Sequence, residues 1–198
     1  MSMEIQCECG KFRAELTKFS KNTPGRLKCY CDDCQSYLHY LKREDLLDEN
    51  GGTEIIPNYP TDIKILTGKE LLKCTRLVPN GMFRFSTTCC NTPIVNTDSK
   101  RPWAGVHRRT FKDPSKLDQA LGPVKSSIMG KYAKGTPPEG TPQKFDFKGV
   151  MMVVPYILKG SLLGKSRPSP FFENGEAIVP PEMLSPDDRH AARAAANV

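Results

Sequence analysis

The chain has 198 residues, of which 38% are hydrophobic and 26% are charged, and its formal net charge is +7. A chain of this size and composition can bury a core without disulfide bonds. Its first residues contain neither the basic segment nor the apolar segment of a secretory signal. The longest uninterrupted apolar run, 150–158, is far shorter than the ~20 residues of a membrane span. We therefore expect a cytoplasmic protein with no membrane partner.

The positive charge lies mainly in the second half of the chain. Residues 1–100 contain 14 Lys and Arg against 13 Asp and Glu, whereas residues 101–198 contain 15 against 9. A basic half can bind nucleic acid or surround a pocket for an anionic small molecule. Because the basic residues are scattered and aromatic residues do not alternate with them, we do not expect a nucleic-acid partner.

The first hundred residues predict short antiparallel strands interrupted by one helix. Phe12, Ala14 and Leu16 alternate with charged neighbours, as in a half-buried strand. Residues 63–66, 71–78 and 82–86 form three further extended runs. A Pro-Asn-Gly turn at 79–81 predicts that the last two runs pair as a hairpin. We expect Asp32 or Asp33 to cap the helix and Gly51-Gly52 to end its segment; its apolar face is formed by Tyr37, Leu38 and Leu41.

The second half predicts helices separated by a loop. Asp113 and Pro114 have the arrangement of a helix N-terminus, and Gly122 ends that helix. Six glycines and prolines make 130–143 a loop, and 148–163 is expected to be a helix that Pro155 kinks or starts late. We expect the Ala-rich stretch 191–196 to be frayed or weakly helical.

Seven of the eight cysteines fall into three clusters, namely Cys7 with Cys9, Cys29 with Cys31 and Cys34, and Cys89 with Cys90. Such spacings place soft thiolates on one tight turn, and tetrahedral Zn²⁺, with Zn–S bonds of ~2.3 Å, selects that geometry. A disulfide framework is the alternative, but it needs an oxidising compartment and is usual in smaller domains. We therefore expect zinc as the cofactor, with one or two ions per chain.

Cys7 and Cys9 provide two ligands of one site, which needs two more from elsewhere in the chain. Cys89 is the best third ligand and Cys90 the most economical fourth, although adjacent cysteines can both ligate only where the backbone turns sharply. Cys74 is the substitute. Its place in an expected strand favours an ordinary buried thiol.

The middle cluster offers three ligands, Cys29, Cys31 and Cys34, without an evident fourth beside them. Three ligands and an open position are typical of a reactive zinc site. His39 points to a different helix face, whereas His107 stays open as a fourth ligand, an acid–base group or an ordinary hydrogen-bonded histidine. Trp103, His107 and 168–172 are candidate pocket walls, although core packing is favoured for Trp103 and Phe171.

The order of Cys7-x-Cys9-Gly10, Cys29-x-Cys31-x-x-Cys34 and an Arg84-Phe85 pair before a late cysteine motif resembles the glutathione-dependent formaldehyde-activating family. That family includes centromere protein V-like proteins, and the resemblance covers about residues 4–97. It implies a β-rich Mss4-like fold with one zinc on the first pair and the late motif. It also implies a second zinc on the triplet, assigned to catalysis, where a thiol such as glutathione meets formaldehyde.

The chain departs from the family pattern at the late motif. The family reads Phe-Cys-x-x-Cys-Gly, whereas residues 85–90 read Phe-Ser-Thr-Thr-Cys-Cys. Ser86 replaces the first cysteine, and a neutral hydroxyl is a poor zinc ligand, so the ligand set must move to Cys90 or the site is lost. Gln35 also replaces a basic residue that usually follows the triplet.

These observations predict a mainly β (α+β) protein with an Mss4-like, zinc-bound antiparallel β-fold and a helical C-terminal extension. We expect a single domain over 1–198, in which 4–110 form the zinc-binding core and 111–198 pack on it. The expected function is a carbon–sulfur lyase for a thiol/aldehyde adduct such as S-hydroxymethylglutathione, with Cys29, Cys31, Cys34 and His107 at the reactive site. The alternative is a non-catalytic zinc-stabilised binding module for a protein or nucleic-acid partner. Whether the chain forms a homodimer stays open.

Overall fold

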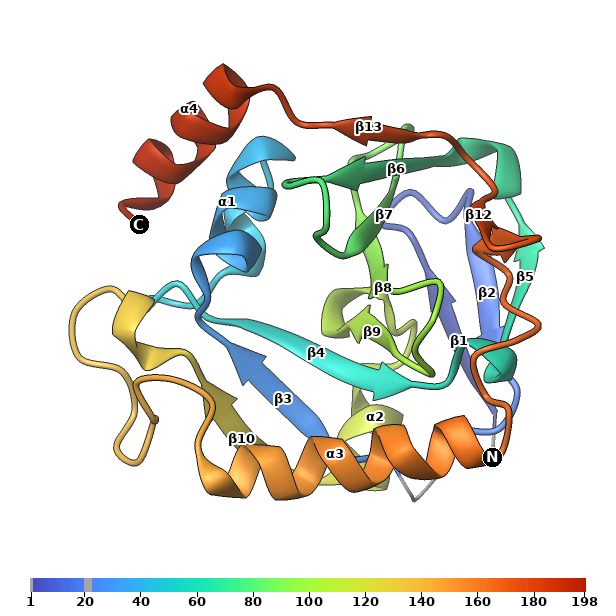
Figure 1. The fold of residues 1–198 in the computed structure, drawn as a ribbon, viewed down its shortest axis with the longest axis horizontal. Coiled ribbons are helices and arrows are strands. Elements are labelled where there is room, and N and C mark those ends of the chain that lie inside the picture. The colour runs from blue at the N-terminus through green and yellow to red at the C-terminus, as the bar shows by residue number, and fades with distance from the viewer. Residues whose placement is uncertain (1, 20–22) are drawn as a thin grey trace.

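The computed structural model describes residues 2–19 and 23–198. Within these residues the main sheet has eight strands, which are β3 (Arg26–Cys29), β4 (Thr53–Asn58), β6 (Leu72–Arg76), β7 (Phe83–Thr87), β8 (Pro93–Thr97), β9 (Ala104–His107), β10 (Val124–Ile128) and β13 (Pro181–Met183). They lie side by side in the order β10-β3-β4-β9-β8-β7-β6-β13 (Figure 1).

Two smaller sheets accompany the main one. The first has three antiparallel strands in chain order, β1 (Met3–Gln6), β2 (Arg13–Leu16) and β5 (Ile63–Thr67). The second is a short antiparallel pair near the C-terminus, β11 (Phe172–Glu173) and β12 (Glu176–Ala177). The described part of the chain also forms four α-helices, α1 (Asp32–Tyr40), α2 (Pro114–Leu121), α3 (Phe147–Leu162) and α4 (Pro186–Ala196). Short 3₁₀ turns lie at Glu44–Leu46, Pro60–Asp62, Lys69–Leu71, Arg108–Thr110 and Gly130–Tyr132.

Several sequence-based expectations are confirmed. The structure is α+β and mostly strands, and it ends in a helix. The expected hairpin is formed by β6 and β7, which pair antiparallel with Cys74 opposite Phe85. Asp113 caps α2 by accepting hydrogen bonds from the backbone N–H groups of Ser115 and Lys116, and Gly122 ends the helix.

The expectation of an antiparallel fold is wrong for the two edges of the main sheet. β10 pairs with β3 in parallel, and β13 pairs with β6 in parallel, so the sheet is mixed. Both edge strands come from the segment expected to be a helical and loop extension. Each strand runs parallel to its neighbour because the chain returns to the sheet through long connections instead of a hairpin turn.

The boundaries of α1 also differ from expectation. Its N-cap is Cys31 and not Asp32 or Asp33, since the Cys31 Sγ accepts a hydrogen bond from the backbone N–H of Cys34 at 3.3 Å. The helix ends at Tyr40, well before Gly51-Gly52. Lys42 takes a left-handed conformation there, with φ of 56°, which a continuing helix does not permit.

The two C-terminal helices are more regular than expected. α3 begins at Phe147 with Asp146 as its cap and contains Pro155, so the proline does not delay its start. The Ala-rich stretch belongs to α4, which is capped by Ser185 and packs against α1 (Figure 1). Its Ala192 and Ala196 are buried, and burial against α1 stabilises a stretch that alone would fray.

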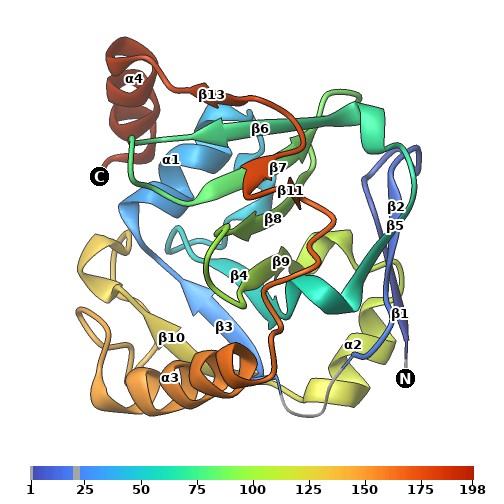
Figure 2. The same cartoon turned by 45° about the vertical axis from the view of Figure 1, so that its right-hand side comes forward.

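The two faces of the main sheet have different roles, because side chains alternate along each strand. One row across the sheet, formed by paired Ile56, Val106, Val95 and Phe85, packs with β1 and β2 into the main core. The opposite face carries two neighbouring rows, one in which Leu27 pairs with Ile55 and one in which Asn96 pairs with Arg84. α3 runs below β3 and β10 in both views (Figure 2).

α3 is apolar on two sides. Tyr156 and Gly160 are buried toward the sheet, whereas Phe147 is 80% and Leu162 is 88% exposed on the outer side. Within the described residues no helix combines the length and apolar character needed to cross a bilayer.

Candidate metal centres

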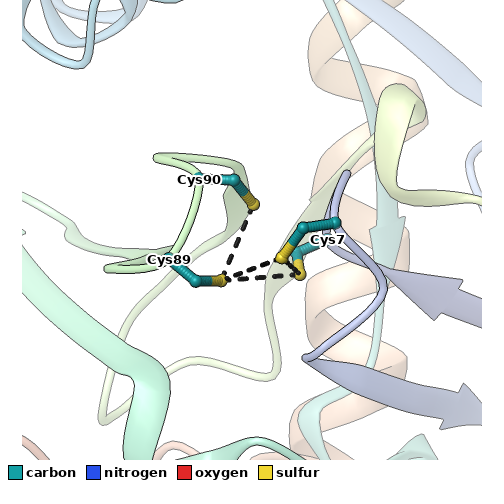
Figure 3. A group of neighbouring side chains, drawn as sticks. Cys7, Cys89 and Cys90 are labelled. Carbon is teal, nitrogen blue, oxygen red and sulfur yellow. Dashed lines mark hydrogen bonds between the residues drawn. The ribbon is translucent and has the colours of Figure 1, made fainter.

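The first cysteine cluster joins two turns that are far apart in the sequence. Cys7 and Cys9 lie in the turn after β1, where Gly10 has a φ of 73° and donates its N–H to the Cys7 carbonyl. Cys89 and Cys90 lie in the turn between β7 and β8 (Figure 3). The Glu8 N–H donates to the Thr92 hydroxyl at 3.1 Å and ties the two turns together.

The four sulfur atoms of this cluster have the spacing of a tetrahedral thiolate site. The sulfur of Cys89 lies 3.7 Å from that of Cys90 and 3.8 Å from that of Cys7 (Figure 3). It lies 3.3 Å from the sulfur of Cys9. The sulfurs of Cys7 and Cys9 are 3.5 Å apart. Zn–S bonds of ~2.3 Å place tetrahedral sulfurs about 3.8 Å apart, so the four thiols fit a metal ion of this kind.

Cys90 takes its place in this group because the backbone turns sharply at the cysteine pair. Asn91 has a φ of 51°, and its N–H donates to the Thr87 carbonyl at 3.0 Å. Burial raises the pKa of the Cys90 thiol, but hydrogen bonds from the Thr87 and Thr92 hydroxyls outweigh it and lower the pKa to about 6. Ser86 is buried in β7, outside the group.

The second cluster lies at the junction of β3 and α1. Cys29 ends the strand, Cys31 caps the helix and Cys34 lies in its first turn, and their three sulfur atoms come within 4.8 Å of one another. Among the described residues no fourth Cys, His or carboxylate joins this group. Three thiols with a free side are the donor set of an open metal site.

Positive charge from a buried arginine reaches this triplet. The Arg84 side chain extends from β7, is 5% exposed, and places its Nη1 atom 4.0 Å from the Cys34 Sγ atom. Its Nη2 atom lies 3.9 Å from the Asp33 carboxylate. Hydrogen bonds from the Cys29 and Cys31 thiols, together with the Arg84 charge, hold the pKa of Cys34 well below its usual range. Cys34 is therefore the thiol of the triplet that favours its thiolate form.

The remaining candidates lie outside both groups. Cys74 is buried in β6 and, as expected for an ordinary thiol, belongs to neither cluster. His39 has its Nδ1 atom 3.3 Å from Glu44. His107 pairs across the sheet with Ile55 and is 4% exposed, and burial lowers its pKa to about 4. His107 is therefore neutral at physiological pH.

A cavity of about 320 Å³ opens beside the triplet. The described residues that line it are Leu27, Cys29, Cys31, Asp33, Cys34, Ile55, Met82, Arg84, Asn96, Asp98, Arg101, Trp103, Ile128, Phe145, Val153 and Ile157. Trp103 lines the cavity and also, in line with the expected core packing, lies partly buried against a second hydrophobic cluster that includes Leu27, Ile55 and Ile128. Phe171 lies in the main core, as expected, with its ring centroid 4.9 Å from that of Phe85. His107 is not among the described residues that line this cavity.

A family model for a family of unknown function, DUF6151, matches residues 1–182. The chain belongs to the DUF6151 family. This DUF6151 chain is also similar to a Rhodobacter sphaeroides protein solved by crystallography as a structural genomics target. The identity is 17% and the TM-score 0.41, over 62% of this chain and 97% of that one. No curated protein matches the chain.

Arg84 and Asp33 are two further residues of this site. The sequence marks Arg84 only as part of a motif and Asp33 only as a candidate helix cap. Phe83 and Phe85 flank Arg84 in a strand, so a period of two places Arg84 on the opposite face from both. A charged residue at such a position in a strand with buried neighbours indicates a polar partner on that face. This alternation is the sequence signal for Arg84 in the DUF6151 chain; for Asp33 we find none.

Proposed function

We propose that both cysteine clusters hold zinc, with a closed structural site at the first and an open reactive site at the triplet. Sulfur-only tetrahedral donor sets favour zinc among the divalent first-row metals. The four-thiol spacing supports the first assignment, and the resemblance to the formaldehyde-activating family, with its Mss4-like fold, supports both. Eight free thiols are also consistent with a reducing compartment such as the cytoplasm.

The activity that we propose is a carbon–sulfur lyase reaction on a thiol/aldehyde adduct. The single observation that carries it is the cavity of about 320 Å³, which is lined by all three cysteines of the triplet. A structural metal site needs no such access, whereas a reactive one does. A zinc ion held by these three thiolates would act as a Lewis acid toward the sulfur of a bound substrate and would keep its thiol ionised near neutral pH.

The residues around the triplet have separate roles in this proposal. Cleavage of a hydroxymethyl thioether breaks the carbon–sulfur bond and leaves its electron pair on sulfur. The hydroxyl loses its proton as the carbonyl of formaldehyde forms, and the sulfur ends as a thiol or thiolate. Asp33 lines the cavity and accepts this proton, while Arg84 orients Asp33 by ion pairing. The buried, neutral His107 is not needed for this step.

The test is the rate of exchange between free formaldehyde and its thiol adduct. Exchange spectroscopy with ¹³C-formaldehyde and a small thiol measures adduct breakdown directly at equilibrium. We expect the native protein to accelerate exchange, Cys31→Ser to abolish the acceleration, and Cys74→Ala to retain it, because Cys74 lies outside both clusters. Equal exchange rates with and without the native, metal-loaded protein would favour the non-catalytic binding module.

A further inference from the structure

The cavity beside the triplet has mostly apolar walls. Its apolar lining comes from three parts of the chain. The strands give Leu27, Ile55 and Ile128, the loops give Met82, Trp103 and Phe145, and α3 gives Val153 and Ile157. A ligand that fills this space exchanges water for hydrocarbon contacts, which favours an apolar group.

Four charged side chains line the same cavity, and three of them already have partners. Asp33 lies 3.9 Å from Arg84 and 3.6 Å from Arg193. The Asp98 carboxylate accepts hydrogen bonds from the backbone N–H groups of Lys100, at 2.7 Å, and Arg101. The Arg101 guanidinium is exposed, and no carboxylate of the described residues lies within ion-pair distance of it. The lining therefore offers one available cation.

We infer that the thiol taken by this site has an apolar carbon skeleton and a single carboxylate, which Arg101 binds, and is not glutathione. This inference rests on the proposed function and names its substrate class. Glutathione carries two carboxylates and an ammonium group, and the apolar walls would leave some of these without partners. Burying an unpaired charge is costly, so the cavity selects against such a ligand.

One of the apolar walls that disfavour charged ligands comes from the second half of the chain. Phe145, Val153 and Ile157 lie beyond residue 97, where the resemblance to the formaldehyde-activating family ends. α3 runs alongside β10 below the triplet's own strand, β3 (Figure 2). The extension thus has a role in this proposal: it supplies one apolar wall of the substrate cavity.

The chain contains its own reporter of cavity occupancy, because Trp103 is its single tryptophan and lines the cavity. Trp103 fluorescence is titrated with butanoate, hexanoate and octanoate, which have the carboxylate and the apolar chain but no thiol. We expect saturable changes whose Kd falls about fourfold per added methylene, the value for a buried CH₂. S-methylglutathione, the polar comparison, should produce no saturable change over the same concentrations.

Two pairs of variants locate the bound carboxylate and the bound chain. Arg101→Ala should weaken octanoate binding about tenfold, as for the loss of a charged hydrogen bond, while neighbouring Lys100→Ala should not. Ile157→Ser, facing the cavity, should weaken binding about fivefold, whereas Leu158→Ser on the exposed side of α3 should not. If circular dichroism shows that Ile157→Ser does not fold, the comparison of Arg101→Ala with Lys100→Ala still tests whether Arg101 binds the carboxylate.

The inference and the proposed function can fail separately. Saturable binding of S-methylglutathione with no dependence on alkyl chain length would overturn the inference and leave the lyase proposal standing. Absence of any carboxylate binding would also overturn it. Chain-length-dependent binding without formaldehyde exchange would support the cavity's selectivity and contradict the lyase.

Discussion

Cys31 combines a candidate metal-ligand position with a helix cap, and the two roles can be separated by substitution. Its Sγ atom accepts the Cys34 N–H while lying within 4.8 Å of the other triplet sulfurs. Serine is a good N-cap but a poor zinc ligand, so Cys31→Ser keeps α1 and removes one metal donor. Alanine removes both and costs about 1 kcal/mol of further stability.

His107 should make the fold sensitive to mild acid. Its pKa is lowered to about 4 in the folded chain by burial, whereas an unfolded histidine titrates near ~6.5. The unfolded state therefore binds more protons below about pH 6.5, and stability falls as the pH drops from there toward about 4. From about pH 7.5 to about pH 5.5 this histidine alone should cost about 1.4 kcal/mol.

Urea unfolding of the native chain and of His107→Gln at both pH values measures this contribution. Acid also releases thiolate-bound metal, but that loss is common to both proteins and cancels in the comparison. The native chain should lose about 1.4 kcal/mol more than the variant. Equal losses would mean that the pKa of His107 is the same in the folded and unfolded states.

At the scale of elements, the position of α3 depends on a close approach at Gly160. A Cβ atom there would lie 2.5 Å from Cε1 of Tyr59 and 2.8 Å from Pro102. The neighbouring Tyr156 ring stacks on the Tyr59 ring with 4.4 Å between the ring centroids, and the Tyr59 hydroxyl donates to the Tyr156 carbonyl at 2.9 Å. Glycine therefore lets the helix lie against the sheet and close the cavity.

Gly160→Ala should destabilise the protein although alanine is the better helix former. The gain in helix propensity is about 1 kcal/mol, whereas overpacking against an aromatic ring costs about 1–3 kcal/mol and moves the helix outward. We expect a lower denaturation midpoint and weaker octanoate binding by Trp103 fluorescence. Ser161→Ala on the exposed side of the same helix is the control and should change neither. A more stable Gly160→Ala protein would show that α3 is not held this closely.

At the scale of the whole molecule, local patterns predicted the elements better than their assembly. The hairpin of β6 and β7 and the ends of α2 follow from turn and capping residues, which act within a few positions. The parallel pairing of β10 with β3 joins residues about a hundred positions apart, and no local pattern encodes it. The same limit applies to the cavity, whose wall of Val153 and Ile157 comes from a distant helix.

The candidate metal centres were more predictable than the cavity, because cysteine spacing carries much of the information. Both groups assemble from the residues that the spacing selected, including Cys90 in place of Ser86. The electrostatic environment was not predictable in this way. Arg84 reaches Cys34 only because β7 lies across the sheet from β3, which is a property of strand order.

The central claim is that the chain holds two zinc ions, one of them on the triplet. The most direct measurement is zinc per chain by mass spectrometry of freshly purified, reduced protein, for the native chain, Cys31→Ser and Cys74→Ala. We expect two zinc ions in the native chain and in Cys74→Ala, and one in Cys31→Ser with its circular dichroism unchanged. Native protein without zinc, or with the same zinc content as Cys31→Ser, would rule out the proposed pair of zinc sites.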